Sequence, residues 1–147
     1  MDTVQALTQQ ETETIKTFYG VFSERNFDVV PEILAPDWQD IPLAPGQAAG
    51  AEGFIGLVKG FTAAFPDVRI NIHEIFGTHE RVGVRAEMVF THSNEFMGIA
   101  PTGKQLTIAI HEFHHLKNGK LEKTWHLEDW FGWFNQVGAS PARGAAA

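Results

Sequence analysis

The chain has 147 residues, of which 44% are hydrophobic and 20% charged, and it carries a net charge of −7 at pH 7. This length and composition are typical of one globular domain and argue against a disordered chain, while the acidic charge argues against nucleic acid and anionic membranes as partners. With no cysteine, no leader-like N-terminus and no apolar run of about 18 residues, we expect a cytoplasmic protein that neither crosses a membrane nor uses thiolates.

The first part of the chain has the pattern of three helices. Thr8 and Glu11 have capping-box spacing, and a helical apolar face follows them. That face consists of Ile15, Phe18, Tyr19 and Phe22. A short second helix is predicted over residues 29–34 and a third over residues 54–65, with a brief extended segment at 38–41 between them.

Beyond residue 67 the apolar period changes from helical to two, which predicts strands. One strand begins at residue 68, and a second follows the turn at residues 77–80. The second strand has one face made of Val82, Val84, Ala86, Met88, Phe90 and His92. Residues 105–116 and 121–130 are two more strand candidates, joined by Asn118-Gly119, a dipeptide typical of tight hairpins.

Helices followed by an antiparallel meander define an α+β class. We expect a curved antiparallel sheet wrapped around the N-terminal helices, forming a cone-shaped α+β barrel with an internal apolar pocket. This single domain is predicted to span residues 1–139, and the small-residue tail at 140–147 is predicted to be disordered.

Several segments resemble the SnoaL-like polyketide cyclases of the nuclear transport factor 2-like superfamily. Ala-Phe-Pro-Asp-Val-Arg at 64–69 looks like that family's junction between third helix and sheet. Phe-Met-Gly-Ile-Ala-Pro-Thr-Gly-Lys at 96–104 looks like its signature loop between long strands. Asn-Gly-Lys-Leu at 118–121 and Trp125 look like its last hairpin, and Gly-Ala at 138–139 like its C-terminal end.

The resemblance implies a barrel with a ligand cavity, frequent homo-oligomers and cofactor-free acid–base chemistry. Characterised members close a polyketide ring by intramolecular aldol condensation. They carry an aspartate, the proposed acid/base, after the tryptophan of the last strand, whereas Trp125 is followed by His126 here. The fold is therefore expected to carry over, but the reaction does not follow from the fold alone.

The histidines of the last hairpin are the main catalytic candidates. A two-residue turn at Asn118-Gly119 places His111 opposite His126, and such a close pair lowers one imidazole pKa. A neutral imidazole can then take up and return a proton. A one-residue bulge would substitute Glu112 for His111. We predict His126 as the acid/base and His111 or Glu112 as its partner. Asp129 is predicted to fix the tautomer of His126 or to cap the last helix. The alternative is that His111 and His126 are hydrogen-bonded structural residues in a polar part of the barrel.

Six aromatic or polar residues are predicted to bind substrate, although aromatic residues at helical spacing are more often core. They are Trp38, Asp40, Phe65, His92, Phe96 and Trp130. His-Glu-Phe-His-His at 111–115 matches a zinc-protease string, but on a strand its outer histidines would be about 13 Å apart and could not share a metal. We predict neither metal nor cofactor, and leave as an alternative a metal held by His111, His126 and a carboxylate.

The combined prediction is a cofactor-independent cyclase that acts on a small apolar or polycyclic molecule and forms a dimer or tetramer. The alternatives are a hydrolase, dehydratase or isomerase of the same fold, or a non-catalytic small-molecule-binding or dimerisation module.

Overall fold

The computed structural model describes residues 3–139, so the predicted tail at 140–147 lies outside the described residues. A short 3₁₀ turn, η1 (Phe27–Val29), precedes the second helix. The helices are α1 (Gln9–Glu24), α2 (Val30–Ile33), α3 (Gly50–Ala64) and α4 (Trp130–Val137). The strands are β1 (Leu34–Ile41), β2 (Arg69–Thr78), β3 (Arg81–Thr91), β4 (Gln105–Lys117) and β5 (Lys120–Glu128).

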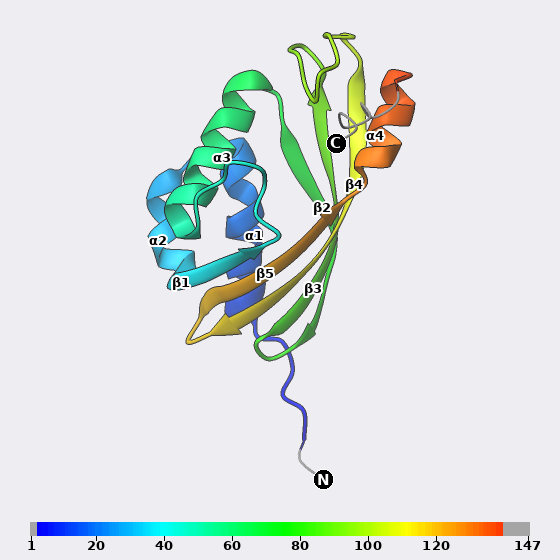
Figure 1. Cartoon of the computed structure of the whole chain (residues 1–147). Coiled ribbons are helices and arrows are strands. Elements are labelled where there is room, and N and C mark those ends of the chain that lie inside the picture. The colour runs from blue at the N-terminus through cyan, green and yellow to red at the C-terminus, as the bar shows by residue number, and fades with distance from the viewer. Residues whose placement is uncertain (1–2, 140–147) are drawn as a thin grey trace, which may run out of the picture.

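The five strands form one sheet in the order β1-β5-β4-β3-β2 (Figure 1). The pairs from β2 to β5 are antiparallel, as predicted, but β1 pairs with β5 in parallel. The sheet is therefore mixed rather than wholly antiparallel, and it remains open. The long connection through α3 and the other strands allows β1 to lie parallel to β5, because it is not joined to β5 by a hairpin.

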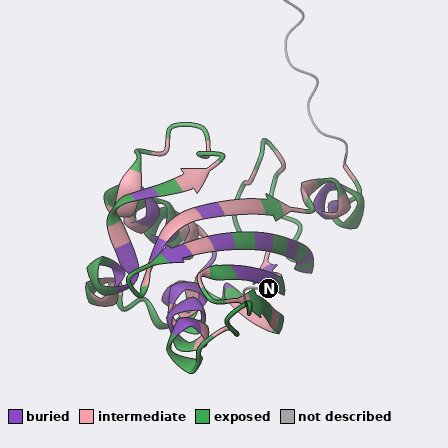
Figure 2. Ribbon diagram, turned by 90° about the horizontal axis from the view of Figure 1, so that it is seen from below, coloured by how far each residue is buried: buried purple, intermediate pink, exposed green. Residues whose placement is uncertain are grey.

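The sheet curves around the first three helices, which gather on one of its sides, while α4 lies near one end of β4 (Figure 1). Burial alternates along the strands (Figure 2), most regularly in β4. The predicted inner face of β3 is confirmed, since all six of its side chains, from Val82 to His92, are buried. No helix between residues 3 and 139 is long and apolar enough to cross a membrane.

The predicted capping box starts α1. Glu11 N–H donates to Thr8 Oγ1 at 3.1 Å, and Thr8 N–H donates to Glu11 Oε2 at 2.8 Å. The other carboxylate oxygen of Glu11 accepts from the Glu80 N–H at 2.9 Å and lies 2.6 Å from His79 Nδ1. Glu11 thus ties the helix start to the β2–β3 turn. The helix ends at Arg25, whose left-handed backbone (φ 56°) closes it.

The β4–β5 hairpin contains a bulge, and this decides which residues face the interior. Its turn is the predicted one, with Asn118 and Gly119 at φ 52° and 79°. Leu116 pairs with Leu121, but His115 already pairs with Lys123, so β5 has one extra residue.

The predicted pairing of His111 with His126 is therefore wrong. A one-residue shift exchanges the two faces of a strand, so Glu112 lies opposite His126 and His111 lies opposite Leu127 on the exposed outer face.

Candidate functional site

A polar cluster lies on the inner face where β1, β5 and β4 meet. It contains Asp40 from β1, Glu112 from β4, and His126 and Glu128 from β5. Two residues apart on one strand, His126 and Glu128 share a face. Parallel pairing brings the end of β1 beside β5, which adds Asp40. Glu112, His126 and Glu128 each contribute one carboxylate oxygen or ring nitrogen to a group of three atoms that lie within 4.8 Å of one another.

Both ring nitrogens of His126 are engaged. Nδ1 lies 2.8 Å from Glu128 Oε1, and Nε2 lies 2.6 Å from the Pro42 carbonyl oxygen and 3.4 Å from Asp40 Oδ1. The hydrogen bond to Glu128 and the nearby negative charges outweigh burial and raise the pKa of His126 to about 9. His126 is thus an imidazolium at neutral pH. The expected neutral imidazole does not form, because its neighbours are carboxylates rather than a second histidine.

Glu112 has the proton affinity expected of an acid/base group near neutral pH. Its side chain is only 8% exposed. Burial raises the pKa of Glu112 to about 7, aided by the charges of Glu128 and Asp40 and opposed by the Tyr19 hydrogen bond and the charge of His126. A carboxyl group that is about half ionised at pH 7 can both take up and deliver a proton. Burial also raises the pKa of Asp40.

Beneath Glu112 runs a buried chain of hydrogen bonds that the sequence reasoning did not find. Tyr19 O–H donates to Glu112 Oε2 at 2.5 Å, and its oxygen lies 2.7 Å from His114 Nε2. His114 Nδ1 lies 2.9 Å from Thr124 Oγ1, which accepts from Trp38 Nε1–H at 3.1 Å.

A signal for part of this chain was available in the sequence. Tyr19 is on the apolar face of the first helix, and His114 shares a strand face with Glu112.

Burial lowers the pKa of His114 to about 3, so that its ring is neutral. Burial and the Glu112 charge raise the pKa of Tyr19, so that its hydroxyl stays protonated.

Asp129 has the second of its two predicted roles, as the cap of the last helix, whereas Trp38 lies in the core. The Asp129 carboxylate is on the exposed side and accepts from the Gly132 N–H at 2.8 Å, which caps α4. Glu128, one residue earlier, is the carboxylate at the His126 ring. Trp38 is buried, and its ring packs edge-on against Phe18 and Phe54.

Three of the other predicted substrate-binding residues, Phe65, Phe96 and Trp130, lie in an aromatic cluster beside the end of β3. Its rings contact one another at centroid distances of 4.6–6.5 Å. The residues of this aromatic cluster are Phe61, Phe65, Phe90, Phe96, Trp130 and Trp133. Phe90 is six residues along β3 from Val84, the partner of Glu112, so these two strand positions are about 20 Å apart. At its other edge the aromatic cluster comes closer to the polar one, because Trp130 follows Glu128 by two residues.

His92 borders the aromatic cluster and is fully buried. Its Nδ1 lies 3.0 Å from Thr102 Oγ1, and its ring packs edge-on against Trp133. Within residues 3–139, neither His92 Nε2 nor Trp133 Nε1 has a hydrogen-bond partner.

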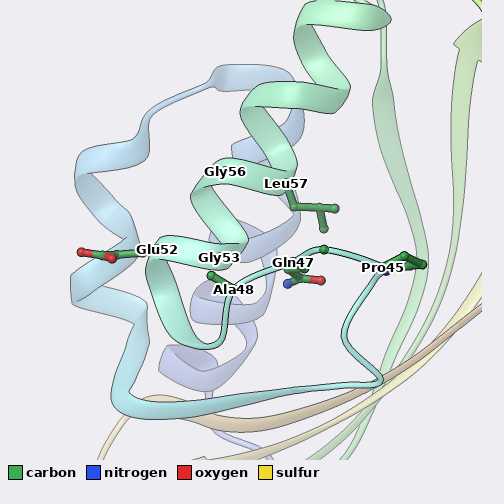
Figure 3. A pocket seen from close by; sticks show the side chains of 8 residues that line it. Pro45, Gln47, Ala48, Glu52, Gly53, Gly56 and Leu57 are labelled. Atoms are coloured by element: carbon green, nitrogen blue, oxygen red, sulfur yellow. The ribbon is translucent and has the colours of Figure 1, made fainter.

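A surface hollow of about 360 Å³ lies between the loop that precedes α3 and the first turns of that helix (Figure 3). It is lined by Pro45, Gly46, Gln47, Ala48, Glu52, Gly53, Gly56 and Leu57. Gln47 connects it to the cluster, because Gln47 Nε2 donates to Asp40 Oδ2 at 2.8 Å. A second hollow of about 300 Å³ lies against the β4–β5 turn at Asn118. The residues predicted to bind substrate line neither of these two hollows.

A curved sheet around helices, with titratable groups on its inner face, defines an α+β protein of the SnoaL and nuclear transport factor 2 type. The sequence model of the SnoaL-like polyketide cyclase family matches residues 12–137, and the chain belongs to this family. No curated protein matches the chain significantly.

Solved structures agree with this assignment. IdmH from Streptomyces antibioticus, described as a candidate polyketide cyclase, is 27% identical over 89% of this chain and 100% of its own, with a TM-score of 0.78. Two further structures share the fold. TsrD from Streptomyces laurentii is 16% identical over 91% of this chain and 99% of its own, with a TM-score of 0.80. A candidate polyketide cyclase from Acidithiobacillus ferrooxidans is 23% identical over 91% of this chain and 98% of its own, with a TM-score of 0.76.

Proposed function

We propose that this protein is a cofactor-independent cyclase that closes a ring in a small apolar or polycyclic molecule by aldol-like acid–base catalysis. The observation that carries the proposal is the buried carboxyl group of Glu112, with a pKa of about 7, opposite the imidazolium of His126. Membership of the SnoaL-like polyketide cyclase family supports the class of reaction.

In the proposed reaction, Glu112 is the base and His126 the electrostatic stabiliser. The Glu112 carboxylate removes a proton from a carbon next to a carbonyl group, and the resulting enolate attacks a second carbonyl of the same molecule. One carbon–carbon bond forms, and the new alkoxide takes the proton back from Glu112, so no co-reactant is consumed. The positive charge of His126 stabilises the enolate and the alkoxide while its own N–H groups stay on Glu128 and the Pro42 carbonyl oxygen.

We propose that substrate approaches through the hollow at Gln47, which adjoins Asp40 and hence His126. The partly buried rings of Phe96 and Trp130 offer flat apolar surface for a polycyclic substrate, and Phe65, 1% exposed, supports Phe96 from within. In this proposal Trp38 and Asp40 shape the reactive end, and His92 lies at the aromatic end.

The test is the substitution Glu112→Gln, which keeps the shape of the side chain but removes the base. A suitable test substrate is an aryl-substituted 1,5-diketone, which can close a six-membered ring by aldol addition. We expect ring closure, and exchange of its acidic C–H protons with deuterated water, to fall by about 10²- to 10⁴-fold.

His111→Gln is the matched control, because His111 is on the same strand but faces outward. It should retain full activity. Undiminished proton exchange in Glu112→Gln would remove Glu112 as the base. Binding of the diketone without exchange in the unmodified protein would favour the non-catalytic binding module.

We also propose that the outer face of the sheet pairs with a second copy of the chain. Phe76, Phe113 and Leu127 are 50%, 56% and 71% exposed there. Trp125 lies beside Phe113, its partner on the neighbouring strand, and its ring packs edge-on against His115. Exposed apolar surface of this kind marks interaction sites. The variant Phe113→Lys should sediment as a monomer if the unmodified protein is an oligomer; an unchanged oligomer would show that the copies meet elsewhere.

A further inference from the structure

The buried chain beneath Glu112 has a direction, and one end of it determines that direction. Trp38, Thr124, His114 and Tyr19 are each at most 2% exposed, so every polar atom in the chain needs a partner within the protein. An indole nitrogen can only donate. Thr124 Oγ1 therefore accepts from Trp38, and the direction of the remaining bonds depends on the single hydroxyl proton of Thr124.

Two directions can be written for the rest of the chain, but only one satisfies Thr124. If His114 donated from Nδ1, Thr124 would accept twice, and its own proton would have no acceptor among residues 3–139. An unpaired buried hydroxyl is unfavourable, because it loses its hydrogen bond to water and gains none within the protein. If Thr124 instead donates to Nδ1, every group is paired. His114 then carries its proton on Nε2 and donates it to the Tyr19 oxygen.

The last bond follows from the others. Because the Tyr19 oxygen accepts from His114, its hydroxyl proton is available only for Glu112 Oε2, which lies within hydrogen-bond distance. That oxygen is thus always an acceptor, and the other carboxyl oxygen of Glu112 is the one left to exchange a proton.

We propose that Tyr19 and His114 are positioning residues for Glu112: the chain that begins at Trp38 locks His114 as the Nε2–H tautomer and holds the Tyr19 hydroxyl on Oε2. The relevance of this lock to catalysis rests on the proposed function, but the lock itself needs no substrate. Glu112 would be held in one orientation, with its second oxygen directed to the reacting carbon.

Glu112 is surrounded by charged groups and by one neutral hydrogen-bond donor, the Tyr19 hydroxyl. His126 and Glu128 face Glu112 from β5 and Asp40 from β1, whereas Tyr19 approaches from α1. The Tyr19 hydrogen bond favours the ionised carboxylate and so opposes the rise in the pKa of Glu112 caused by burial. Removing the hydroxyl should therefore raise that pKa above its present value of about 7.

The experiment is NMR on the whole protein labelled with ¹⁵N in histidine and ¹³C in the glutamate carboxyl carbon, from about pH 5 to about pH 9. We expect a single Nε2–H tautomer of His114 over this range while Glu112 titrates. In Thr124→Val, which replaces the hydroxyl with a methyl group, the Nδ1–H tautomer should appear at the acidic end of the range, where a protonated Glu112 can donate to the Tyr19 oxygen. Thr62→Val is the matched control, since Thr62 is also buried but bonds within its own helix.

Tyr19→Phe is the second variant, and it should move the Glu112 titration to higher pH. An Nδ1–H tautomer of His114 in the unmodified protein, or an unmoved Glu112 titration in Tyr19→Phe, would overturn the inference. These outcomes are independent of the diketone assay. If Glu112→Gln keeps its proton-exchange activity, the proposed function fails while the direction of the chain can still be observed.

Discussion

Glu112 and His126 lie directly opposite each other on neighbouring antiparallel strands, and both face the interior of the curved sheet. This pairing puts a buried carboxyl group beside an imidazolium, whose charge favours the ionised form of that carboxyl group. It exists because β5 carries one extra residue between Leu121 and Lys123. Without that bulge the strand faces would be exchanged, and two histidines would meet instead.

The charge of His126 should be visible in the titration of Glu112. His126→Gln removes a positive charge that favours the ionised carboxylate, so we expect the pKa of Glu112 to rise above about 7. The carboxyl ¹³C signal of Glu112, followed against pH, measures this directly. His111→Gln, on the outer face of β4, should leave the same titration in place, and an equal shift in both variants would contradict the assignment.

The protonated ring of His126 should also make stability depend on pH in the alkaline range. Its folded pKa of about 9 is above the unfolded value of 6.5. The stabilisation is therefore complete below about pH 6.5 and is lost as the pH rises through about 9. Urea unfolding of the unmodified protein and of His126→Gln should differ most near pH 6 and converge near pH 10. A gap that widens with pH would show that the sign is wrong.

Glu11 should contribute stability with the opposite dependence on pH. Burial opposes its ionisation, but hydrogen bonds from the backbone of Thr8 and Glu80 and from His79 lower its pKa below 4.5. The stabilisation is thus present above about pH 4.5 and is lost as the pH falls further. Glu11→Gln should destabilise the protein by about 1 kcal/mol at neutral pH, as the loss of a helix cap does.

The matched variant for that experiment is Glu13→Gln on the same helix. Glu13 is exposed, and its carboxylate forms a surface ion pair with Lys16 Nζ at 3.7 Å. Such pairs contribute little, so its substitution should change the free energy of unfolding by less than about 0.5 kcal/mol. Equal effects of the two substitutions in urea unfolding would argue against a special role of the capping box.

The hollow at Gln47 can be filled without disturbing the core. A Cβ atom added to Gly56 would have no other atom within 4 Å, and Gly56 lines the hollow. Gly56→Phe should therefore weaken binding and turnover of the aryl diketone while the protein stays folded. Gly60→Phe, one turn later on α3 and equally free of contacts, should have no such effect. Unchanged diketone binding in Gly56→Phe would rule out the hollow as the route to Glu112.

Local patterns in the sequence were sufficient for most of the architecture. The Thr8–Glu11 box, the apolar face of the first helix and the Asn118-Gly119 turn each depend on side chains and backbone within a few residues of one another. Such short-range preferences act in any tertiary context that tolerates them, so they predicted the helices, the four-stranded meander and the α+β class. The resemblance carried by residues 64–69 and 96–104 indicated the family.

The candidate site was decided by contacts that no local pattern encodes. The bulge in β5 selects Glu112 rather than His111, the parallel pairing of β1 brings Asp40 to His126, and Tyr19 reaches Glu112 across 93 residues of sequence. Each of these depends on how the helices pack inside the curved sheet, because a shift of one residue along a strand costs little locally but exchanges every buried side chain for an exposed one. The sequence by itself thus determined which elements form, whereas packing between distant segments decided which titratable groups meet.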